Sequence, residues 1–382
     1  MKVLMFLSNA FTSDLRVYNE ARSLLSAGHE VTVIAWDREK QSPPRQNWDG
    51  IEVVRLRTRL LPKRYRYASP FWVGFNLILW QWQAYRRALL LNKQRRFGAI
   101  HCHDFDTLAI GTRLKRKLKI PLVYDAHEIY GYITARLLPS WVADIFLRTE
   151  KRLIKKVDRM ITDGEGRKRY FEMITDRPIS VVMNCKPLQS LEYQPPNTES
   201  FTLLYIGTLW QSRMPLGVVE AARELPGVRC LIGGIGRPDY VQALKEECLR
   251  TSNVTFLGRV PFDEVIPMTL KAHAVVYLVN PDHVNIRLAM PHKIGEAMVC
   301  GRPIICTKGT YSGEITEREQ TGLVIQNSVD ALRKAIIKLR DNPELGEMLG
   351  RNALKAAIAQ YNWQKQEEKL LELYRGVVNG EG

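Results

Sequence analysis

The sequence lacks the signals of a membrane-spanning protein, of a Cys-x-x-Cys site and of a secreted protein. No run reaches the roughly 18 uninterrupted apolar residues of a membrane-spanning helix, because the nearest candidate, 70–91, is interrupted by Asn76, two glutamines and an Arg-Arg pair. The six cysteines show no Cys-x-x-Cys spacing, which predicts reduced, buried thiols of a cytoplasmic protein. The opening MKVLMFL is too short an apolar run for a signal peptide and predicts a strand.

Acidic residues are scarce in only one half of the chain. Residues 1–190 hold 34 lysines and arginines against 18 acidic residues, whereas residues 191–382 hold 22 of each, so the formal net charge of +16 lies in the first half. Such a surface attracts anionic lipid, at about 1 kcal/mol per basic residue near the membrane, or nucleic acid; a generic solubility charge is the alternative. We favour an anionic membrane surface, which predicts a peripheral protein on the inner face of the cell membrane, and expect no nucleic acid.

The length of 382 residues exceeds one ordinary core and predicts two domains. Short continuous apolar runs alternate with helical patterns in both halves, which is typical of α/β folds with doubly wound parallel sheets. Residues 184–200 hold three prolines and no periodicity, and predict the linker. We expect two Rossmann-like domains, 1–187 and 200–360, facing across a cleft. The expected strands are 2–7, 31–35, 51–56, 99–102, 122–124, 160–162, 202–206, 228–232, 254–257, 274–278, 303–306 and 323–325.

The most informative segment is 291–325, PHKIGEAMVCGRPIICTKGTYSGEITEREQTGLVI. Pro291 suits the first turn of a helix, Gly301-Arg302-Pro303 ends that helix, and Thr307 to Gly313 is expected to form a polar loop. A helix N-terminus that faces a cleft is a ready anion site. Glu296, a carboxylate inside the helix, could accept hydrogen bonds from a ribose diol. One segment could therefore hold both halves of a nucleoside diphosphate.

The pattern P-x-K-x-x-E-A-M-x-x-G-x-P, followed by T-G-L-V, resembles the donor-binding segment of the GT-B glycosyltransferases, specifically the retaining family 4. The resemblance continues over nearly the whole chain, through DLR (14–16), AGHEVTVIAW (27–36), HCHD (101–104), YDAHE (124–128) and YIGTL (205–209). It implies a GT-B fold in which the C-terminal helix, 362–380, crosses back to the first domain. It also implies transfer of a sugar from a nucleotide sugar to a saccharide or lipid-linked acceptor, with retention and without a metal or cofactor. By family frequency the donor is a UDP-sugar, with GDP as the main competitor.

The resemblance assigns the donor diphosphate to loops of the second half. In the family, the loop that here begins at Gly207 supplies two cations to the donor pyrophosphate. Thr208 replaces the first of these cations, and Arg213 keeps the second. Lys293, in the first turn of the helix after Pro291, is the expected substitute for the missing charge, and Arg287 is the weaker candidate.

Further donor contacts follow from the same resemblance. Gly234 and Gly236 are expected in a Gly-rich turn that lets the backbone approach the nucleotide, and Val260 is expected beside the base. Glu296 matches the second Glu of the family's E-x7-E motif, the ribose ligand. Leu288 stands where the first Glu normally supports the transferred sugar, so sugar recognition would need other groups, such as Asn285, His292 or backbone N–H.

The loops of the first half supply the remaining site residues. His127 resembles the family's active-site histidine, which contacts the donor sugar. His101 and His103 share one strand face, but no third metal ligand is evident, so no metal is expected. If the enzyme inverted configuration, a carboxylate or His127 would have to act as the base. The expected acceptor-side residues are Asp14, Arg16, His103, Asp104 and Glu128.

Two other functions stay open at this point. A nucleotide-sugar epimerase with the GT-B fold would use the same nucleotide site without a separate acceptor. A basic, non-enzymatic nucleic-acid-binding protein would explain the charge but not Glu296 or the order of the loops.

Overall fold

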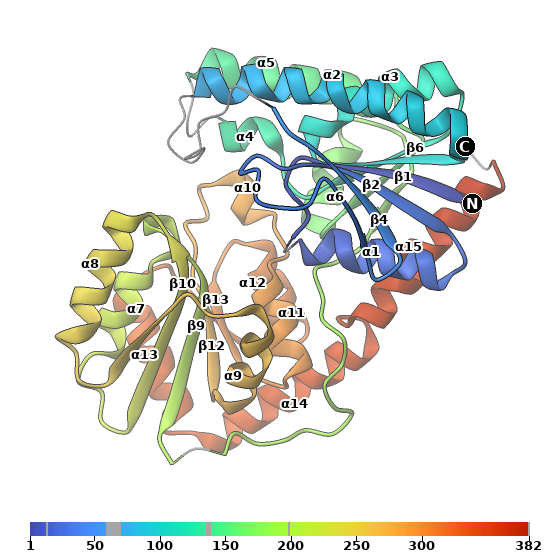
Figure 1. Cartoon of the computed structure of the whole chain (residues 1–382). Coiled ribbons are helices and arrows are strands. Elements are labelled where there is room, and N and C mark those ends of the chain that lie inside the picture. The colour runs from blue at the N-terminus through green and yellow to red at the C-terminus, as the bar shows by residue number, and fades with distance from the viewer. Residues whose placement is uncertain (13, 59–69, 135–138, 198, 381–382) are drawn as a thin grey trace. The chain divides into compact units, whose positions relative to one another are not determined.

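The computed structural model describes the whole chain except residues 13, 59–69, 135–138, 198 and 381–382. The described residues divide into two compact units (Figure 1). Unit 1 comprises residues 1–182 and 367–382, and unit 2 comprises residues 183–366. The helix α15 (Trp363–Val378) therefore begins in unit 2 and continues in unit 1.

Unit 1 is built on an eight-stranded sheet in the order β3-β4-β2-β1-β5-β6-β7-β8. All neighbouring pairs are parallel except β3 and β4. The central strands are buried apolar runs, as a sheet covered on both faces requires. The strands are β1 (Lys2–Leu7), β2 (Glu30–Trp36), β3 (Arg45–Trp48), β4 (Ile51–Leu56), β5 (Ala99–His103), β6 (Leu122–Ala126), β7 (Arg159–Thr162) and β8 (Ile179–Val181).

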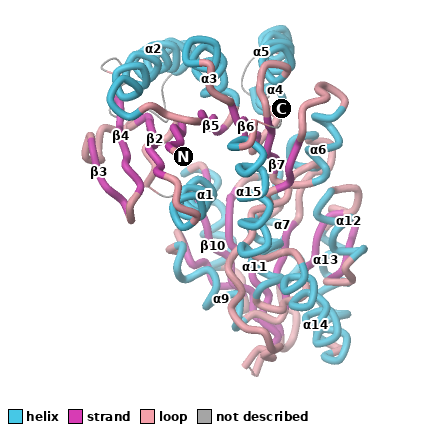
Figure 2. Tube along the Cα trace, turned by 90° about the vertical axis from the view of Figure 1, so that its right-hand side faces the viewer, coloured by secondary structure: helices cyan, strands magenta, loops and turns pink. Residues whose placement is uncertain are grey.

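The helices of unit 1 cover both faces of this sheet. Helices α2, α3 and α5 lie side by side over one face, and α1 lies over the other (Figures 1 and 2). Helix α1 begins where Asp14 accepts a hydrogen bond from the backbone N–H of Val17, an N-cap that the sequence pattern suits. The helices are α1 (Leu15–Ser26), α2 (Pro70–Arg95), α3 (Phe105–Leu118), α4 (Tyr130–Thr134), α5 (Ser140–Ile154) and α6 (Glu165–Glu172).

Unit 2 repeats the design with a six-stranded parallel sheet in the order β11-β10-β9-β12-β13-β14. Its strands are β9 (Phe201–Leu209), β10 (Val228–Gly236), β11 (Val254–Gly258), β12 (Ala274–Tyr277), β13 (Ile304–Thr307) and β14 (Gly322–Ile325). Its helices are α7 (Pro215–Ala222), α8 (Pro238–Leu249), α9 (Val265–Lys271), α10 (Val284–Arg287), α11 (His292–Val299), α12 (Tyr311–Arg318), α13 (Val329–Arg340) and α14 (Pro343–Ala359), with short 3₁₀ turns at Gln211–Arg213 and Phe262–Glu264.

The strand order reverses at one point in each sheet. In unit 1, the strands after β1 are added on one side of it as far as β4, and the strands from β5 onward are added on its other side. The order therefore reverses between the neighbouring strands β1 and β5. In unit 2 the reversal lies between β9 and β12. Ligands of open α/β sheets bind at the carboxyl ends of the strands at such points. The loops after these strands are therefore the expected ligand-binding segments.

Two expectations about local structure were wrong. The predicted loop from Thr307 to Gly313 is cut short because α12 begins at Tyr311, where the Thr310 hydroxyl caps the helix by accepting from the Gly313 N–H. The glycines of 233–236 form the end of strand β10 and not a turn. A Cβ on Gly234 would lie 1.7 Å from the Gly207 carbonyl oxygen of β9, so this glycine is needed for the close approach of two strands.

All the strands expected from apolar runs are present, whereas β3 and β8 were not foreseen. Strand β3 has the sequence RQNW, which carries no apolar signal, and it pairs at the sheet edge. Among the described residues, no helix has both the length and the apolar content needed to cross a bilayer.

Candidate active site

Unit 2 contains a cavity of about 380 Å³ at the carboxyl ends of β9 and β10, beside the first turn of α11. Gly236 lies outside its lining, and a Cβ there would clash with the Leu209 carbonyl oxygen, so this glycine serves strand pairing. Asn285 and Arg287 also lie outside the lining. The other residues expected to bind the donor all line the cavity: Gly207, Thr208, Arg213, Gly234, Val260, Pro291, Lys293 and Glu296, together with His292.

Two cations in this cavity form no ion pair with a carboxylate of the described residues. Arg213 donates a hydrogen bond of 2.7 Å to the Tyr277 hydroxyl, and the Lys293 ammonium lies 3.8 Å from the centre of the Tyr205 ring. Burial, and then the neighbouring Arg213 charge, lower the pKa of Lys293 to about 7 despite the opposing effect of Glu296. An anion placed between Arg213 and Lys293 would relieve their repulsion.

Glycine at position 207 makes room for Lys293. Gly207 has φ of 151°, and a Cβ there would lie 2.5 Å from Cε of Lys293. The lysine side chain therefore passes directly over the end of β9 to reach the cavity. Lys293 of α11 therefore brings its ammonium group to the end of β9, beside Thr208.

Glu296 is buried in α11 and has a partner that the sequence pattern did not reveal. The Lys186 ammonium lies 3.6 Å from Oε1 of Glu296 and 3.3 Å from the centre of the Phe262 ring. Burial raises the pKa of Glu296, and the charges of Lys186 and Lys293 oppose that rise. Lys186 belongs to the segment predicted as a linker, where nothing in the local sequence marks it as part of a site; only the apolar positions around Cys185 hint that it is buried.

In unit 1, His127 is held between two carboxylates at the end of β6. Its Nε2 lies 2.6 Å from Oδ2 of Asp125, its Nδ1 lies 3.4 Å from Oδ2 of Asp104, and its backbone N–H donates to Asp104. Burial alone would lower the pKa of His127, but the charges of Asp104 and Asp125 outweigh it and raise the pKa well above its usual range. The raised pKa favours the protonated form of His127, which disfavours this residue as a general base.

The other expected acceptor-side residues divide into accessible and buried groups. Asp14, Asp104 and Glu128 are at least partly exposed. Arg16 and His103 are buried, so neither offers a free surface for an acceptor. Arg16 instead donates to both carboxylate oxygens of Asp125, at 2.9 and 2.7 Å.

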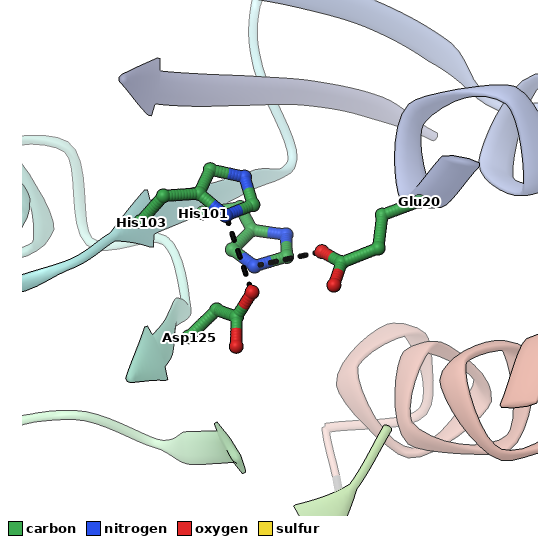
Figure 3. Close-up of side chains that lie close together, drawn as sticks. All are labelled: Glu20, His101, His103 and Asp125. Carbon is green, nitrogen blue, oxygen red and sulfur yellow. Dashed lines mark hydrogen bonds and ion pairs between the residues drawn. The ribbon is translucent and has the colours of Figure 1, made fainter. Parts of the chain in front are cut away.

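His101 and His103 do have further partners that could ligate a metal, contrary to the sequence expectation. Figure 3 shows Glu20 of α1 and Asp125 of β6 pointing toward the two stacked imidazoles, and the ligand atoms of these four buried residues lie within 4.8 Å of one another. However, the Arg16 guanidinium already occupies both oxygens of Asp125 and lies 3.2 Å from Oε1 of Glu20. Its positive charge stabilises the Asp125 carboxylate, and a divalent cation would have to displace it.

The sequence also contains an Asp-x-Asp spacing, of the kind that can bind a metal, at Asp104 and Asp106. Asp104 pairs with His127, and Asp106 is buried 3.8 Å from Arg38. Burial and the nearby Asp104 charge raise the pKa of Asp106 to about 6. Each carboxylate thus has a cationic neighbour within the protein.

Comparison with known protein families identifies the family to which this chain of two α/β units belongs. Residues 14–184 match the glycosyl transferase 4-like domain, and residues 191–356 match the glycosyl transferases group 1 family. The chain is a GT-B glycosyltransferase of the family 4 type. The resemblance noted in the sequence is therefore confirmed, and the two parallel-sheet units are the two halves of the GT-B fold.

The individual proteins that resemble this glycosyltransferase share only a low sequence identity with it. The D-inositol 3-phosphate glycosyltransferase of Mycobacterium marinum is 23% identical over 76% of the chain, and the match spans 66% of that relative, slightly less than two thirds of its length. Sucrose-phosphate synthase from Thermosynechococcus elongatus has a similar structure, with a TM-score of 0.81, 18% identity and full coverage of both chains. Anabaena HepE, solved with UDP-glucose, has a TM-score of 0.73 at 17% identity, covering 98% of this chain and all of that one.

Proposed function

We propose that this glycosyltransferase takes its sugar from a nucleoside diphosphate sugar bound in the cavity of unit 2. The observation that carries the proposal is the pair of cations Arg213 and Lys293, which form no ion pair within the described part of the chain. They lie beside the N-terminal turn of α11 and next to Glu296. Cations and a helix N-terminus suit a diphosphate, and a buried carboxylate suits the ribose hydroxyls. UDP is the expected nucleotide, with GDP as its competitor; HepE, a structural neighbour, was solved with UDP-glucose.

The chemistry follows from these charges. The bond between the anomeric carbon and the donor phosphate oxygen breaks, and a bond from that carbon to an acceptor hydroxyl oxygen forms. Arg213 and Lys293 stabilise the negative charge that develops on the leaving diphosphate. In the retaining reaction that we propose, the leaving phosphate oxygen takes the acceptor proton, so that neither a metal nor a protein base is required. The raised pKa of His127 supports a route without a histidine base.

The acceptor that we propose is a saccharide or a lipid-linked saccharide at an anionic membrane surface, approached through the basic first half of the chain. Asp14, Asp104 and Glu128, the accessible members of the expected acceptor-side residues, are the expected contacts of its hydroxyls. Nucleic acid is not an expected partner.

Titration calorimetry with UDP-glucose, UDP, GDP and ADP, in the presence of a chelator, tests the donor site. We expect one nucleotide class to bind the wild type, and Glu296→Ala and Lys293→Met each to weaken it by at least about tenfold, since each removes a charged hydrogen-bond partner. Arg250→Met, which changes a solvent-exposed cation of α8's C-cap, is the matched control. Binding of no nucleotide by the wild type would refute the proposal.

Product analysis with the preferred nucleotide sugar separates transfer from epimerisation. A transferase yields free nucleoside diphosphate and needs an acceptor or water, whereas an epimerase converts the sugar without any acceptor. The anomeric configuration of the product, read by nuclear magnetic resonance, then decides between retention and inversion.

A further inference from the structure

Helix α2 is apolar on two opposite sides. A surface helix normally presents one apolar stripe to the core and polar residues to solvent. Here the side facing solvent also carries large apolar side chains at helical spacing, between 41% and 64% exposed. The buried residues are Asn76, Trp80, Ala84, Ala88 and Leu91, and the exposed ones are Trp72, Phe75, Ile78, Trp82 and Leu90.

Helix α5 adds to this surface from the same layer. Its first turns expose Trp141 and Ile145, 65% and 53% respectively. Helices α2, α3 and α5 cover one face of the sheet (Figures 1 and 2), and each is followed by a parallel strand. Their C-terminal ends therefore lie near the amino edge of the sheet, and their first turns lie toward the carboxyl edge. The exposed aromatic residues consequently gather toward the end of the layer where the acceptor-side loops begin.

The exposed charges of this layer are almost all positive. Asp144 is the one exposed carboxylate in the described part of α2, α3 and α5. One of the cations, Arg86, lies over the Trp82 ring at 4.7 Å, where the aromatic first half of α2 meets its basic second half. The exposed basic residues of the three helices are Arg86 and Lys93 in α2, Arg113, Arg116 and Lys117 in α3, and Arg148, Lys151 and Arg152 in α5.

We propose that this α2–α5 face (Trp72, Phe75, Ile78, Trp82, Trp141 and Ile145 with the basic residues above) inserts into the headgroup boundary of an anionic bilayer. Tryptophan is favoured at this depth because its ring is apolar and its N–H stays hydrated, and basic residues on the same surface bind anionic headgroups. The inference rests on the proposed function, in which the acceptor is carried by a membrane. It goes further by naming hydrophobic insertion, and the residues that insert, in place of adsorption by charge alone.

Charge decides between a bilayer and other occupants of this face. Two copies of the chain placed face to face would bring together two surfaces that each hold many cations and one exposed carboxylate, and would repel one another. An anionic bilayer neutralises the cations while it covers the apolar side chains. A second copy or a protein partner is therefore an outcome of the test and not the expected occupant.

Vesicle flotation of the full chain tests the proposal, with phosphatidylcholine vesicles that contain or lack phosphatidylglycerol, at low and high salt. We expect binding to the anionic vesicles that is weakened but not abolished by high salt, since inserted apolar side chains are not screened. A triple variant, Trp72→Gln, Ile78→Gln and Trp82→Gln, should bind at least about tenfold more weakly. The matched control is Met173→Gln with Leu249→Gln, two apolar residues of similar or greater exposure outside this face.

A second readout reports insertion directly. Bromine-labelled lipids should quench part of the wild-type tryptophan fluorescence, and the triple variant should lose most of that quenching. The proposal is overturned if the wild type does not bind anionic vesicles, or if the triple variant binds them as well as the wild type does. It is also overturned if light scattering shows a wild-type dimer that the triple variant does not form. Nucleotide binding measured on the same proteins should not change, because the cavity is in unit 2; its loss would count against the donor site and not against this face.

Discussion

Lys186 and Glu296 form a buried ion pair, with Nζ 3.6 Å from Oε1, at the edge of the cavity in unit 2. Phe262 closes over the lysine ammonium and helps to desolvate it. The pair fixes the direction of the Glu296 carboxylate, the group expected to bind the donor ribose. We therefore infer that Lys186 positions this carboxylate in the proposed donor site, although Lys186 lies outside the cavity lining.

Replacing Lys186 by Met should leave a buried carboxylate without its nearest cation. Removing one partner of a buried pair costs about 3 kcal/mol or more, so we expect a lower melting temperature and roughly tenfold weaker nucleotide-sugar binding. Calorimetry and thermal unfolding measure the two effects. Lys271→Met, at an exposed lysine of α9, is the control. Unchanged nucleotide affinity in Lys186→Met would show that Glu296 does not depend on this lysine.

Lys293 should couple donor binding to proton uptake. Its pKa is lowered to about 7 in the free protein, so above that pH the lysine must take up a proton to pair with a diphosphate. As pH rises from the pKa of Lys293 in the free protein to its pKa in the complex, each pH unit weakens binding by about 1.4 kcal/mol, which is tenfold in affinity. A nucleotide sugar is the suitable ligand, since its two phosphates do not titrate in this range.

Calorimetry in buffers of different ionisation enthalpy counts the protons taken up on binding. We expect close to one proton at about pH 8 and much less at about pH 6, where the lysine is already charged. Lys293→Arg, which stays protonated throughout, should bind with little pH dependence. Equal proton uptake by wild type and Lys293→Arg would contradict this assignment.

His127 should remain protonated through neutral pH. Its raised pKa depends mainly on Asp104 and Asp125, so Asp125→Asn should lower it and allow the imidazole to titrate in the neutral range. Because the pKa of His127 is higher in the folded state, protonation of its imidazole stabilises the fold. This contribution to the free energy of unfolding is complete below the unfolded-state pKa of about 6.5, and it is lost as pH rises through the folded-state pKa. Nitrogen chemical shifts of the imidazole, followed against pH, measure the titration.

Asp104→Asn is the graded comparison for this titration. The charge of Asp104 raises the pKa of His127 more than that of Asp125 does, although Asp125 lies nearer to the ring, because Asp125 is also paired with Arg16. We expect a larger fall in the pKa of His127 than in Asp125→Asn. A wild-type His127 that titrates near its ordinary pKa would mean that the two carboxylates do not hold the proton.

Gly234→Ala should destabilise unit 2 strongly. The added Cβ would lie 1.7 Å from the Gly207 carbonyl oxygen, and the residue has φ of 145°. Because β9 and β10 would have to separate at the floor of the cavity, we expect a loss of more than about 2 kcal/mol in chemical unfolding. Gly346→Ala is the control: nothing lies within 4 Å of its new Cβ in α14, and the exchange should stabilise that helix by up to about 1 kcal/mol.

Local sequence was sufficient for most of the architecture. The strands β1, β2, β9 and β12 are largely apolar because a parallel sheet is covered on both faces. The start of α11 after Pro291 and the placement of Glu296 in that helix also follow from local pattern. The start of α12 did not, because Tyr311 and Ser312 give no helical signal until the Thr310 hydroxyl is seen to cap the Gly313 N–H.

The sequence by itself determined the two parallel sheets, the family, and the segment that carries the cavity's carboxylate, since each depends on residues that are close together in the chain. Only the tertiary structure decided the partners of those residues. Arg16 and Asp125 are 109 positions apart, and Lys186 reaches Glu296 from the connecting segment, so neither pair leaves a local trace. Likewise, an aromatic pattern on α2 indicates a helix with apolar faces, but only the packed layer shows that one of them is turned toward solvent.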